Sequence, residues 1–455
     1  MKYDLVLLHA PSVYDFRKNF LLAGPISDVV PSSPVFEMYP IGLTSIADYL
    51  ERFGLRVKII NIANRMLMSE KFDVEKKLKK IKTRAFGIDL HWLPHAHGSI
   101  ELAKIVKKLH PDTPMIFGGL SATYYHKELI KYPFIDFVMR GDSTEKLMLL
   151  LMNKLELGNM FYADIPNLTW KKGSEIGYNP ITYVPTDLDD IDIPGYRYTV
   201  RSVFKYRNFL DPIPYNGWLQ YPNTALLTAR GCSQNCLICG GSKDAYDQNC
   251  GRRSLALRSP EKLVEDIQFI SRFSRAPIFI LHDLRQGGRE YVKEFFSRLK
   301  EVNLKNEIVF ELFQYAGEEF FQMMNESCPK YSIEITLETH DEKIRRYNGK
   351  FNCTNPKVIE TLNFALKHGA KKIDLFFMTG IPSQTYQSAI ENIDFCEEIH
   401  LACNQDPRLF YFVAPLAPFL DPASLAFENP ELHGFKKFCH TLEDHRKAIT
   451  QPSWK

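Results

Sequence analysis

The sequence predicts an α/β protein with an amino-terminal doubly wound domain of the flavodoxin-like type, followed by a partial (β/α)6 barrel. Short apolar runs alternate with amphipathic helical stretches along most of the 455 residues, which is the pattern of parallel sheets covered by helices. This rhythm is interrupted once, between about residues 153 and 223. A composition of 45% hydrophobic and 24% charged residues is typical of a soluble globular chain with two or three domains.

Five apolar runs predict the strands of the first domain, which we place at residues 1–152. Amphipathic segments between the runs predict helices that cover the sheet. In such a domain, ligands bind at the carboxyl ends of the strands. The predicted strands are 5–9, 57–62, 85–90, 114–117 and 134–139, and the predicted helices include 41–53, 74–81 and 100–109.

Residues 153–223 lack this alternation, and we interpret them as a connector. A hairpin is predicted over residues 167–179, with its turn near Lys172-Gly173. An acidic, proline-containing run follows at 187–194 and is typical of an irregular linking segment.

The alternation of strand and helix resumes from residue 224 and predicts a second domain over residues 224–440. Six strand-and-helix units fit an incomplete barrel better than a second open nucleotide-binding fold. Residues 441–455 are left as a carboxyl-terminal segment. The predicted strands are 224–228, 278–282, 308–313, 332–337, 372–378 and 408–413.

Charge and hydropathy exclude several classes of protein. The formal net charge of +3 is too small for an extended nucleic-acid footprint. No apolar run approaches the roughly 20 residues of a membrane-spanning helix, and the start of the chain lacks a signal-peptide layout. We therefore expect a cytoplasmic protein that binds no nucleic acid. The lysine-rich stretch 70–84 is interpreted as a solvated helix face, with peripheral contact to an anionic membrane or an acidic protein as the alternative.

Three of the nine cysteines, Cys232, Cys236 and Cys239, lie within eight residues on a loop that follows an apolar strand. Without a secretion signal, such cysteines indicate a metal site rather than a disulfide framework. Three thiolates can hold three corners of an iron–sulfur cube and leave the fourth iron open. A structural zinc site needs a fourth Cys or His nearby, and the neighbouring sequence lacks one. A zinc-bound or merely buried trio remains the alternative.

The C-x3-C-x2-C spacing after the first strand of a partial barrel resembles the signature of the radical S-adenosylmethionine (radical SAM) superfamily. The resemblance implies a [4Fe-4S] cluster held by Cys232, Cys236 and Cys239, with SAM chelating the fourth iron. Reductive cleavage of SAM would then yield a 5′-deoxyadenosyl radical. One departure is Ile238, since the family usually has an aromatic residue just before the third cysteine.

The same resemblance implies a set of SAM contacts. Asp283 would meet the ammonium group, Glu338 the ribose hydroxyls and Arg345 the carboxylate. The segment Gly380-Ile381-Pro382-Ser383-Gln384-Thr385 resembles a G-I-P-G-x-T motif whose backbone pairs with adenine, although a serine replaces its second glycine. Gly240 and Gly241, which follow the third cysteine, are also assigned to SAM, together with Gly380 and Pro382. Taken singly, each residue is explained nearly as well as a strand end or a helix cap.

A doubly wound domain ahead of such a barrel resembles the cobalamin-binding class of the superfamily. A Gly118-Gly119 pair ends the fourth predicted strand and lets a bulky cofactor lie against bare backbone. The resemblance implies cobalamin contacts at His91, Gly118, Gly119 and Gly141. The D-x-H-x-x-G loop that supplies a histidine to cobalt is absent after the first strand, so we expect the cobalamin tail displaced and no histidine from that loop on cobalt. A domain that has lost the cofactor is the alternative.

The histidines 91, 95 and 97 could suggest a metal site, but cofactor or substrate contact is preferred because loop spacing alone fixes no geometry. The runs 415–422 and 441–446 resemble an uncharacterised archaeal and bacterial branch of B12-binding radical SAM proteins. Members of that branch continue further, which raises the expectation of a truncated carboxyl end at Lys455.

The favoured activity is methylation of an unactivated carbon of a small-molecule or lipid-like substrate, with flavodoxin or ferredoxin as electron donor. Radical cyclisation or rearrangement of an apolar substrate, without methyl transfer, is the second hypothesis. A non-catalytic metal-binding scaffold is the third. The sequence specifies cofactors far better than it specifies a substrate.

Overall fold

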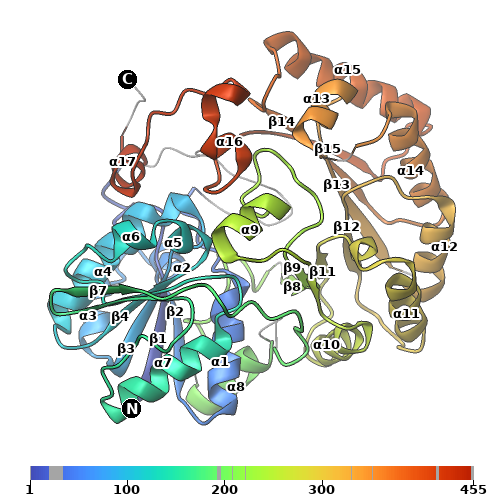
Figure 1. The fold of residues 1–455 in the computed structure, drawn as a ribbon. Helices are drawn as coiled ribbons and strands as arrows, with labels where there is room; N and C mark the ends of the chain where they lie inside the picture. Colours follow the sequence, from blue (N-terminus) through green and yellow to red (C-terminus); the bar gives the residue numbers. More distant parts are fainter. Residues whose placement is uncertain are drawn as a thin grey trace.

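The computed structural model arranges the chain as two α/β units that pack side by side (Figure 1). It describes residues 2–19, 34–191, 196–207, 209–220, 222–328, 330–350, 352–416 and 420–451. Parts of three segments that were interpreted from the sequence lie outside the described residues. These parts are 192–194 of the acidic run, 417–419 of the run 415–422, and 452–455 of the carboxyl-terminal segment.

The first sheet has seven strands in the order β2-β1-β3-β4-β5-β6-β7. The first five are parallel, which confirms the predicted doubly wound domain and places the reversal of strand order between β1 and β3. Their bounds are β1 (Lys2–His9), β2 (Val57–Asn61), β3 (Lys82–Asp89), β4 (Met115–Gly118) and β5 (Phe137–Met139).

The hairpin predicted for the connector extends this sheet. Strand β6 (Leu168–Lys172) pairs antiparallel with β5, and β7 (Glu175–Tyr178) pairs antiparallel with β6. Leu168 and Trp170 are buried in the core beside the sheet. The hairpin thus covers an edge that β5 would otherwise expose, which the local turn signal alone does not reveal.

The apolar run of β1 serves two cores, because successive residues of a strand point to opposite faces of a sheet. Leu5 and Leu7 pack in the core beside α1 and α7, whereas Val6 and Leu8 pack in the core beside α4. The predicted helices are confirmed, and α8 packs against α1. Their bounds are α1 (Ile41–Arg52), α2 (Ile62–Met68), α3 (Val74–Lys79), α4 (Ala96–Leu109), α5 (Leu120–Tyr124), α6 (His126–Leu129), α7 (Glu145–Leu157) and α8 (Tyr196–Tyr206).

The second sheet has six parallel strands in the order β15-β14-β13-β12-β11-β8, which confirms the predicted partial barrel. The strands are β8 (Thr224–Leu227), β11 (Ile278–Leu281), β12 (Ile308–Leu312), β13 (Tyr331–Glu338), β14 (Ile373–Thr379) and β15 (Leu409–Pro415). Helices line the outer side of this sheet (Figure 1). They are α10 (Pro260–Phe273), α11 (Arg289–Lys300), α12 (Glu318–Ser327), α14 (Asn355–Lys367) and α15 (Tyr386–Ala402).

The carboxyl-terminal segment returns from the barrel to the first unit (Figure 1). Helix α16 (Leu425–Glu428) lies on the way, and α17 (Leu442–Ala448) packs against α4. Glu128 accepts a 2.8 Å hydrogen bond from the backbone N–H of Leu442. Among the described residues, no helix is long and apolar enough to span a membrane.

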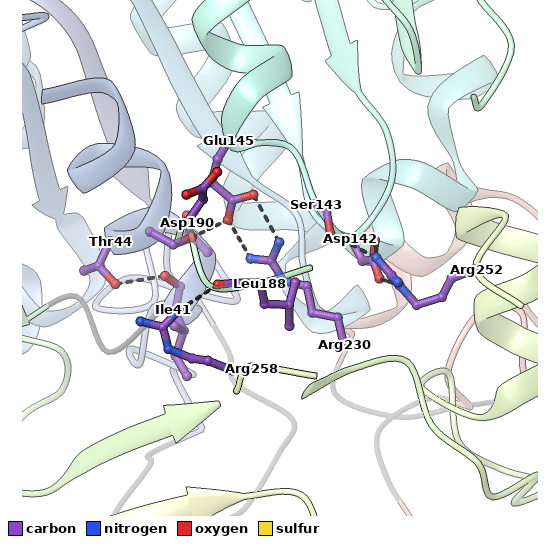
Figure 2. A network of polar contacts seen from close by, with 12 residues as sticks. Ile41, Thr44, Asp142, Ser143, Glu145, Leu188, Asp190, Arg230, Arg252 and Arg258 are labelled. Atoms are coloured by element: carbon purple, nitrogen blue, oxygen red, sulfur yellow. Dashed lines mark hydrogen bonds and ion pairs between the residues drawn. The ribbon is translucent and has the colours of Figure 1, made fainter. Parts of the chain in front are cut away.

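Buried ion pairs join the two units (Figure 2). Arg230 lies on the short strand β9 (Ala229–Arg230) of the second unit, and its guanidinium donates to both oxygens of Glu145, at 2.5 and 3.1 Å. Ser45 donates a further 2.7 Å hydrogen bond to Glu145. Beside this pair, Arg252 binds Asp142 through its side chain. Burial raises the pKa of Glu145, but the charge of Arg230 and the hydrogen bonds from Arg230 and Ser45 together outweigh burial and hold that pKa below its ordinary value.

We expect Arg230→Met to lower the free energy of unfolding by about 3–5 kcal/mol, because it leaves the Glu145 carboxylate buried without a counter-charge. Urea denaturation at neutral pH measures the change. The matched control is Arg253→Met, since Arg253 is 85% exposed in its pair with Asp247 and surface pairs contribute about 0–1 kcal/mol. The second variant Arg230→Met/Glu145→Leu should recover most of the loss. An unfolding curve for Arg230→Met that matches the control would contradict the role of the pair.

Gly119, between β4 and α5, adopts φ +111° and ψ 169°, a conformation that is essentially restricted to glycine. A Cβ atom there would lie 2.7 Å from the Cα of His91, in the turn that follows β3. A Cβ on the neighbouring Gly118 would meet only the carbonyl oxygen of Met139, at 3.7 Å. Gly119 therefore permits a close approach of two turns at the carboxyl edge of the sheet.

Gly119→Ala should destabilise the fold by at least about 1–3 kcal/mol from backbone strain alone, with the steric overlap adding to this. Thermal unfolding followed by circular dichroism tests the expectation. Gly118→Ala is the control and should unfold close to the parent temperature. Equal unfolding temperatures for the two variants would refute the argument.

Candidate functional site

A cavity of about 440 Å³ lies where the carboxyl ends of the first sheet face the barrel. The four residues to which the sequence analysis assigned cobalamin contact, His91, Gly118, Gly119 and Gly141, all line it. On the barrel side it is lined by inner-face residues of β8 and β11, namely Ala225, Leu227, Phe279 and Leu281. Both units thus contribute to one chamber.

The cavity continues into the first unit as an apolar slot. Leu7, Gly87 and Ile116 line it from the sheet, and Leu43 and Met148 line it from α1 and α7. A Cβ on Gly87 would lie 2.7 Å from the Leu7 side chain, so a larger residue at position 87 would collide with Leu7. Gly87 therefore leaves this part of the sheet surface without a protruding side chain. Bare backbone at the rim and an apolar slot behind it fit a large cofactor with a bulky tail, such as cobalamin.

The three nearby histidines have different partners. Burial lowers the pKa of His91 to about 4, so its imidazole in the cavity is neutral. His95 instead contacts the carbonyl oxygen of Phe36 at 2.9 Å, and His97 accepts a 3.2 Å hydrogen bond from the Tyr14 N–H. Across the described part of the chain, no trio of His, Cys, Asp or Glu is arranged to hold a single metal ion.

A buried His9–Asp89 pair lies at the carboxyl ends of β1 and β3, where the strand order reverses. His9 Nδ1 lies 2.9 Å from a carboxylate oxygen of Asp89, and His9 Nε2 lies 3.0 Å from the Phe36 carbonyl oxygen. The sequence analysis missed this pair. The signal was available, since both residues end strands that become neighbours in a doubly wound sheet.

The three clustered cysteines lie on the loop between β9 and helix α9 (Lys243–Cys250). The backbone N–H groups of Gln234 and Gly241 lie 3.3 Å from the sulfurs of Cys232 and Cys239, as suits thiolates. Burial raises the pKa of Cys236 to about 11 and that of Cys239 to about 12. Such thiols ionise only beside a compensating cation, which a metal cluster supplies.

Gly240 and Gly241 follow the third cysteine and are held by the loop itself and by the carboxyl-terminal segment. The Gly240 N–H donates a 3.0 Å hydrogen bond to Asp421. A Cβ on Gly240 would lie 2.8 Å from the Cβ of Asp421, so only glycine allows this approach. Ile238 packs with Ile344 and Ile381 in an apolar cluster, in the position where the family has an aromatic residue.

Glu338 ends β13 with φ +66°, an unfavourable conformation for a non-glycine residue, and is 4% exposed. Within the described residues its Oε2 atom has no hydrogen-bond partner, and burial raises its pKa to about 7. An unpaired buried carboxylate oxygen at a strand end fits a ligand with hydroxyl groups.

Asp283 and Arg345 differ in how far their polar atoms are engaged. Both carboxylate oxygens of Asp283 are engaged, by the Arg285 guanidinium and by the Phe313 N–H at 2.8 Å. Arg345 is fully buried, and one nitrogen of its guanidinium donates to the Asn355 side chain at 2.5 Å. Its Nε and Nη1 atoms have no hydrogen-bond partner among the described residues. Asp283 is thus engaged within the chain, whereas Arg345 keeps two buried donors that an anionic ligand could meet.

Lys350 is a cation whose electrostatic partners include Cys236 and Cys239 of the cysteine loop, and it was not predicted from the sequence. Burial lowers the pKa of its ammonium group, but the combined charges of Cys236, Glu338, Cys239 and Glu311 outweigh burial and hold that pKa above its ordinary value. Its Nζ lies 4.5 Å from the centre of the Phe313 ring. No motif marks Lys350, so only the folded chain reveals it.

The segment after β14 is a tight turn closed by hydrogen bonds within the barrel. The Gly380 N–H donates to Gln384 at 2.8 Å, and the Pro382 carbonyl accepts from Asn348 at 3.1 Å. Ser383 has φ +66°, so it adopts the left-handed conformation that the glycine of the motif would favour.

Comparison with known proteins agrees with this geometry. The B12 binding domain model matches residues 28–151, and the radical SAM superfamily model matches residues 226–396. Cytidylyl-2-hydroxyethylphosphonate methyltransferase of Streptomyces wedmorensis is 22% identical over 87% of this chain and 78% of that relative. Anaerobic magnesium-protoporphyrin IX monomethyl ester cyclase of Rubrivivax gelatinosus is 24% identical over 68% of this chain and 55% of that relative.

Among solved structures, radical S-adenosylmethionine methyltransferase TsrM from Kitasatospora setae, with cobalamin and a [4Fe-4S] cluster bound, has a TM-score of 0.65 at 13% identity. The similarity covers 98% of this chain and 84% of that one, and it shows a shared fold. The two family models follow each other in the order that the two units have in the structure. The chain therefore belongs to the cobalamin-binding class of the radical SAM superfamily.

Proposed function

We propose that this protein is a cobalamin-dependent radical SAM methyltransferase that methylates an unactivated carbon. The observation that carries the proposal is the chamber between the units, because Gly118, Gly119 and the barrel strands β8 and β11 line the same space. A carrier bound at the first sheet would face a substrate held at the barrel. The curated methyltransferase relative, which matches along most of both chains, supports this choice of reaction.

Cys232, Cys236 and Cys239 would hold the cluster, and His91, Gly118, Gly119 and Gly141 would hold cobalamin. Bound there, the cluster and SAM supply a one-electron cleavage that generates a carbon radical, and cobalamin supplies a transferable methyl group. The chain itself orients both cofactors and keeps water from the chamber through its apolar walls.

For SAM, the supporting geometry favours Glu338 at the ribose and the backbone around Gly380 and Pro382 at the adenine. Arg345 would meet the SAM carboxylate, because its buried Nε and Nη1 atoms have no hydrogen-bond partner among the described residues. Lys350, whose electrostatic partners include Cys236 and Glu338, is a second cation for this end of the ligand. Gly240, Gly241 and Asp283 would act by shaping the loop and strand end that the ligand meets.

A radical cyclisation or rearrangement without methyl transfer is the second candidate, and the cyclase relative is the observation that favours it. It would use the same barrel residues. The two candidates differ in whether a methyl group leaves SAM, so product analysis separates them.

We expect the anaerobically reconstituted protein, supplied with hydroxocobalamin, SAM and either dithionite or a flavodoxin system, to form S-adenosylhomocysteine only when cobalamin is bound. Mass spectrometry of S-adenosylhomocysteine and 5′-deoxyadenosine measures this. Deoxyadenosine without S-adenosylhomocysteine in the presence of a turned-over substrate would favour cyclisation or rearrangement. An iron-loaded protein that yields neither product with candidate substrates would favour a scaffold.

Cys236→Ala should abolish cluster assembly, because two thiolates cannot replace the three that the loop offers. Iron and acid-labile sulfide are counted after reconstitution, together with the visible absorbance. Cys396→Ala is the matched control, since Cys396 lies on α15 beside the barrel core and away from the loop. We expect the control to bind about four irons per chain. Full iron content in Cys236→Ala would rule out this ligand set.

A further inference from the structure

A second cavity, of about 410 Å³, lies next to the cofactor chamber. The two cavities share the lining residues Met38, Tyr39, Ile41, Asn223 and Ala225. The shared residues come from the segment leading into α1 and from the start of β8. The second cavity therefore adjoins the chamber at the seam between the two units.

Apolar side chains make most of the wall of this second cavity. Val200 and Val203 line it from α8, and Ile213, Trp218 and Leu219 line it from the segment that follows. Among the described lining residues none carries a charge, and the polar ones are Thr, Asn and Tyr. A charged or sugar-like ligand would lose its hydration here without gaining ionic partners. A hydrocarbon chain would lose only unfavourable contact with water.

Large apolar side chains that remain exposed mark the mouth of the same cavity. Phe204 is 78% exposed, Phe209 63% and Leu219 66%, and all three also line the cavity. Clustered exposed apolar residues around a cavity indicate a contact surface for apolar ligands rather than a random scatter.

The wall at 209–215 is held from behind by polar contacts. The buried Asn61 side chain donates to the carbonyl oxygens of Ile213 and Pro214, each at 3.0 Å. Lys58 and Lys77 pair with Asp211 at 3.0 and 3.1 Å. Because the backbone is anchored on this side, the apolar side chains of the segment are kept facing the cavity. The volume also lies within the roughly 300–1,000 Å³ that is typical of small-molecule sites.

We propose that this second cavity binds the hydrocarbon chain of an apolar substrate and delivers the chain to the cofactor chamber past Asn223 and Ala225. The proposal deepens the proposed function by naming the substrate class. The reaction of the bound chain rests on the proposed function, whereas the binding of a hydrocarbon chain in the second cavity does not. The ligand enters between α8 and the 209–219 segment. The carbon to be modified is then part of, or next to, a hydrocarbon chain.

Equilibrium dialysis with carbon-14-labelled 1-dodecanol tests the proposal on the full chain, both free of cofactor and loaded with hydroxocobalamin. The parent should bind one dodecanol per chain. An excess of unlabelled tryptophan should not displace the labelled dodecanol. Val203→Trp fills the cavity and should weaken dodecanol binding at least tenfold. Phe209→Asp changes only the exposed mouth, is safe for folding, and should weaken binding at least threefold.

The matched control is Ile393→Trp, because Ile393 is 64% exposed on α15 and lines neither cavity. Its dodecanol affinity should equal that of the parent. The proposal would be overturned if the parent showed no saturable dodecanol binding. It would also be overturned if Val203→Trp and Phe209→Asp both bound dodecanol with the affinity of the parent. The absorbance of bound cobalamin is read in the same samples. A parent that binds dodecanol but no cobalamin would contradict the proposed function while supporting the hydrocarbon site.

Discussion

The buried pair of Arg230 and Glu145 is the contact on which the arrangement of the site depends. Arg230 directly precedes the cysteine loop. Glu145 begins α7, just after Gly141, Asp142 and Thr144, which line the cofactor chamber. The pair therefore fixes the start of the loop relative to the cofactor edge of the first sheet. Its donors and acceptors satisfy one another, which a buried charge requires. Arg252 and Asp142 form a second buried ion pair beside it, which also joins the two units (Figure 2).

The barrel stores conformational strain at its carboxyl ends, where ligands are expected to bind. His282, Glu338 and Ser383 follow or end three different strands, and all have positive φ angles without being glycine. Such residues persist only where the surrounding structure over-determines them, and they tend to cluster at functional sites. The Glu311 side chain holds the His282 N–H at 2.6 Å, which shows how a neighbouring strand stabilises one of these turns. The same strand ends carry the unpaired oxygen of Glu338.

The sequence predicted most of the fold because buried parallel strands consist of continuous apolar runs, and both sheets are built largely from such strands. The hairpin at 167–179 was found but misplaced, since a turn signal carries no information about which sheet the strands join. At the site, spacing identified the cysteine loop and the glycine edge. It could not identify side-chain partners: Asp283 is bound by Arg285, one nitrogen of Arg345 is bound by Asn355, and Lys350 has no motif. Contacts between distant residues arise only from packing.

Cofactor and substrate binding should be coupled to docking of the two units, because both cavities are lined by residues from both sides of the seam. A ligand that touches both units stabilises their docked arrangement in proportion to its differential affinity for it. The same docked arrangement then favours the second ligand, since linkage between binding free energies is reciprocal. Tyr39 provides a direct link between the two sites, because it lines both cavities. Its hydroxyl donates a 2.7 Å hydrogen bond to the carbonyl oxygen of Pro212, and this bond anchors the wall of the second cavity. Filling either cavity therefore constrains a residue that shapes the other.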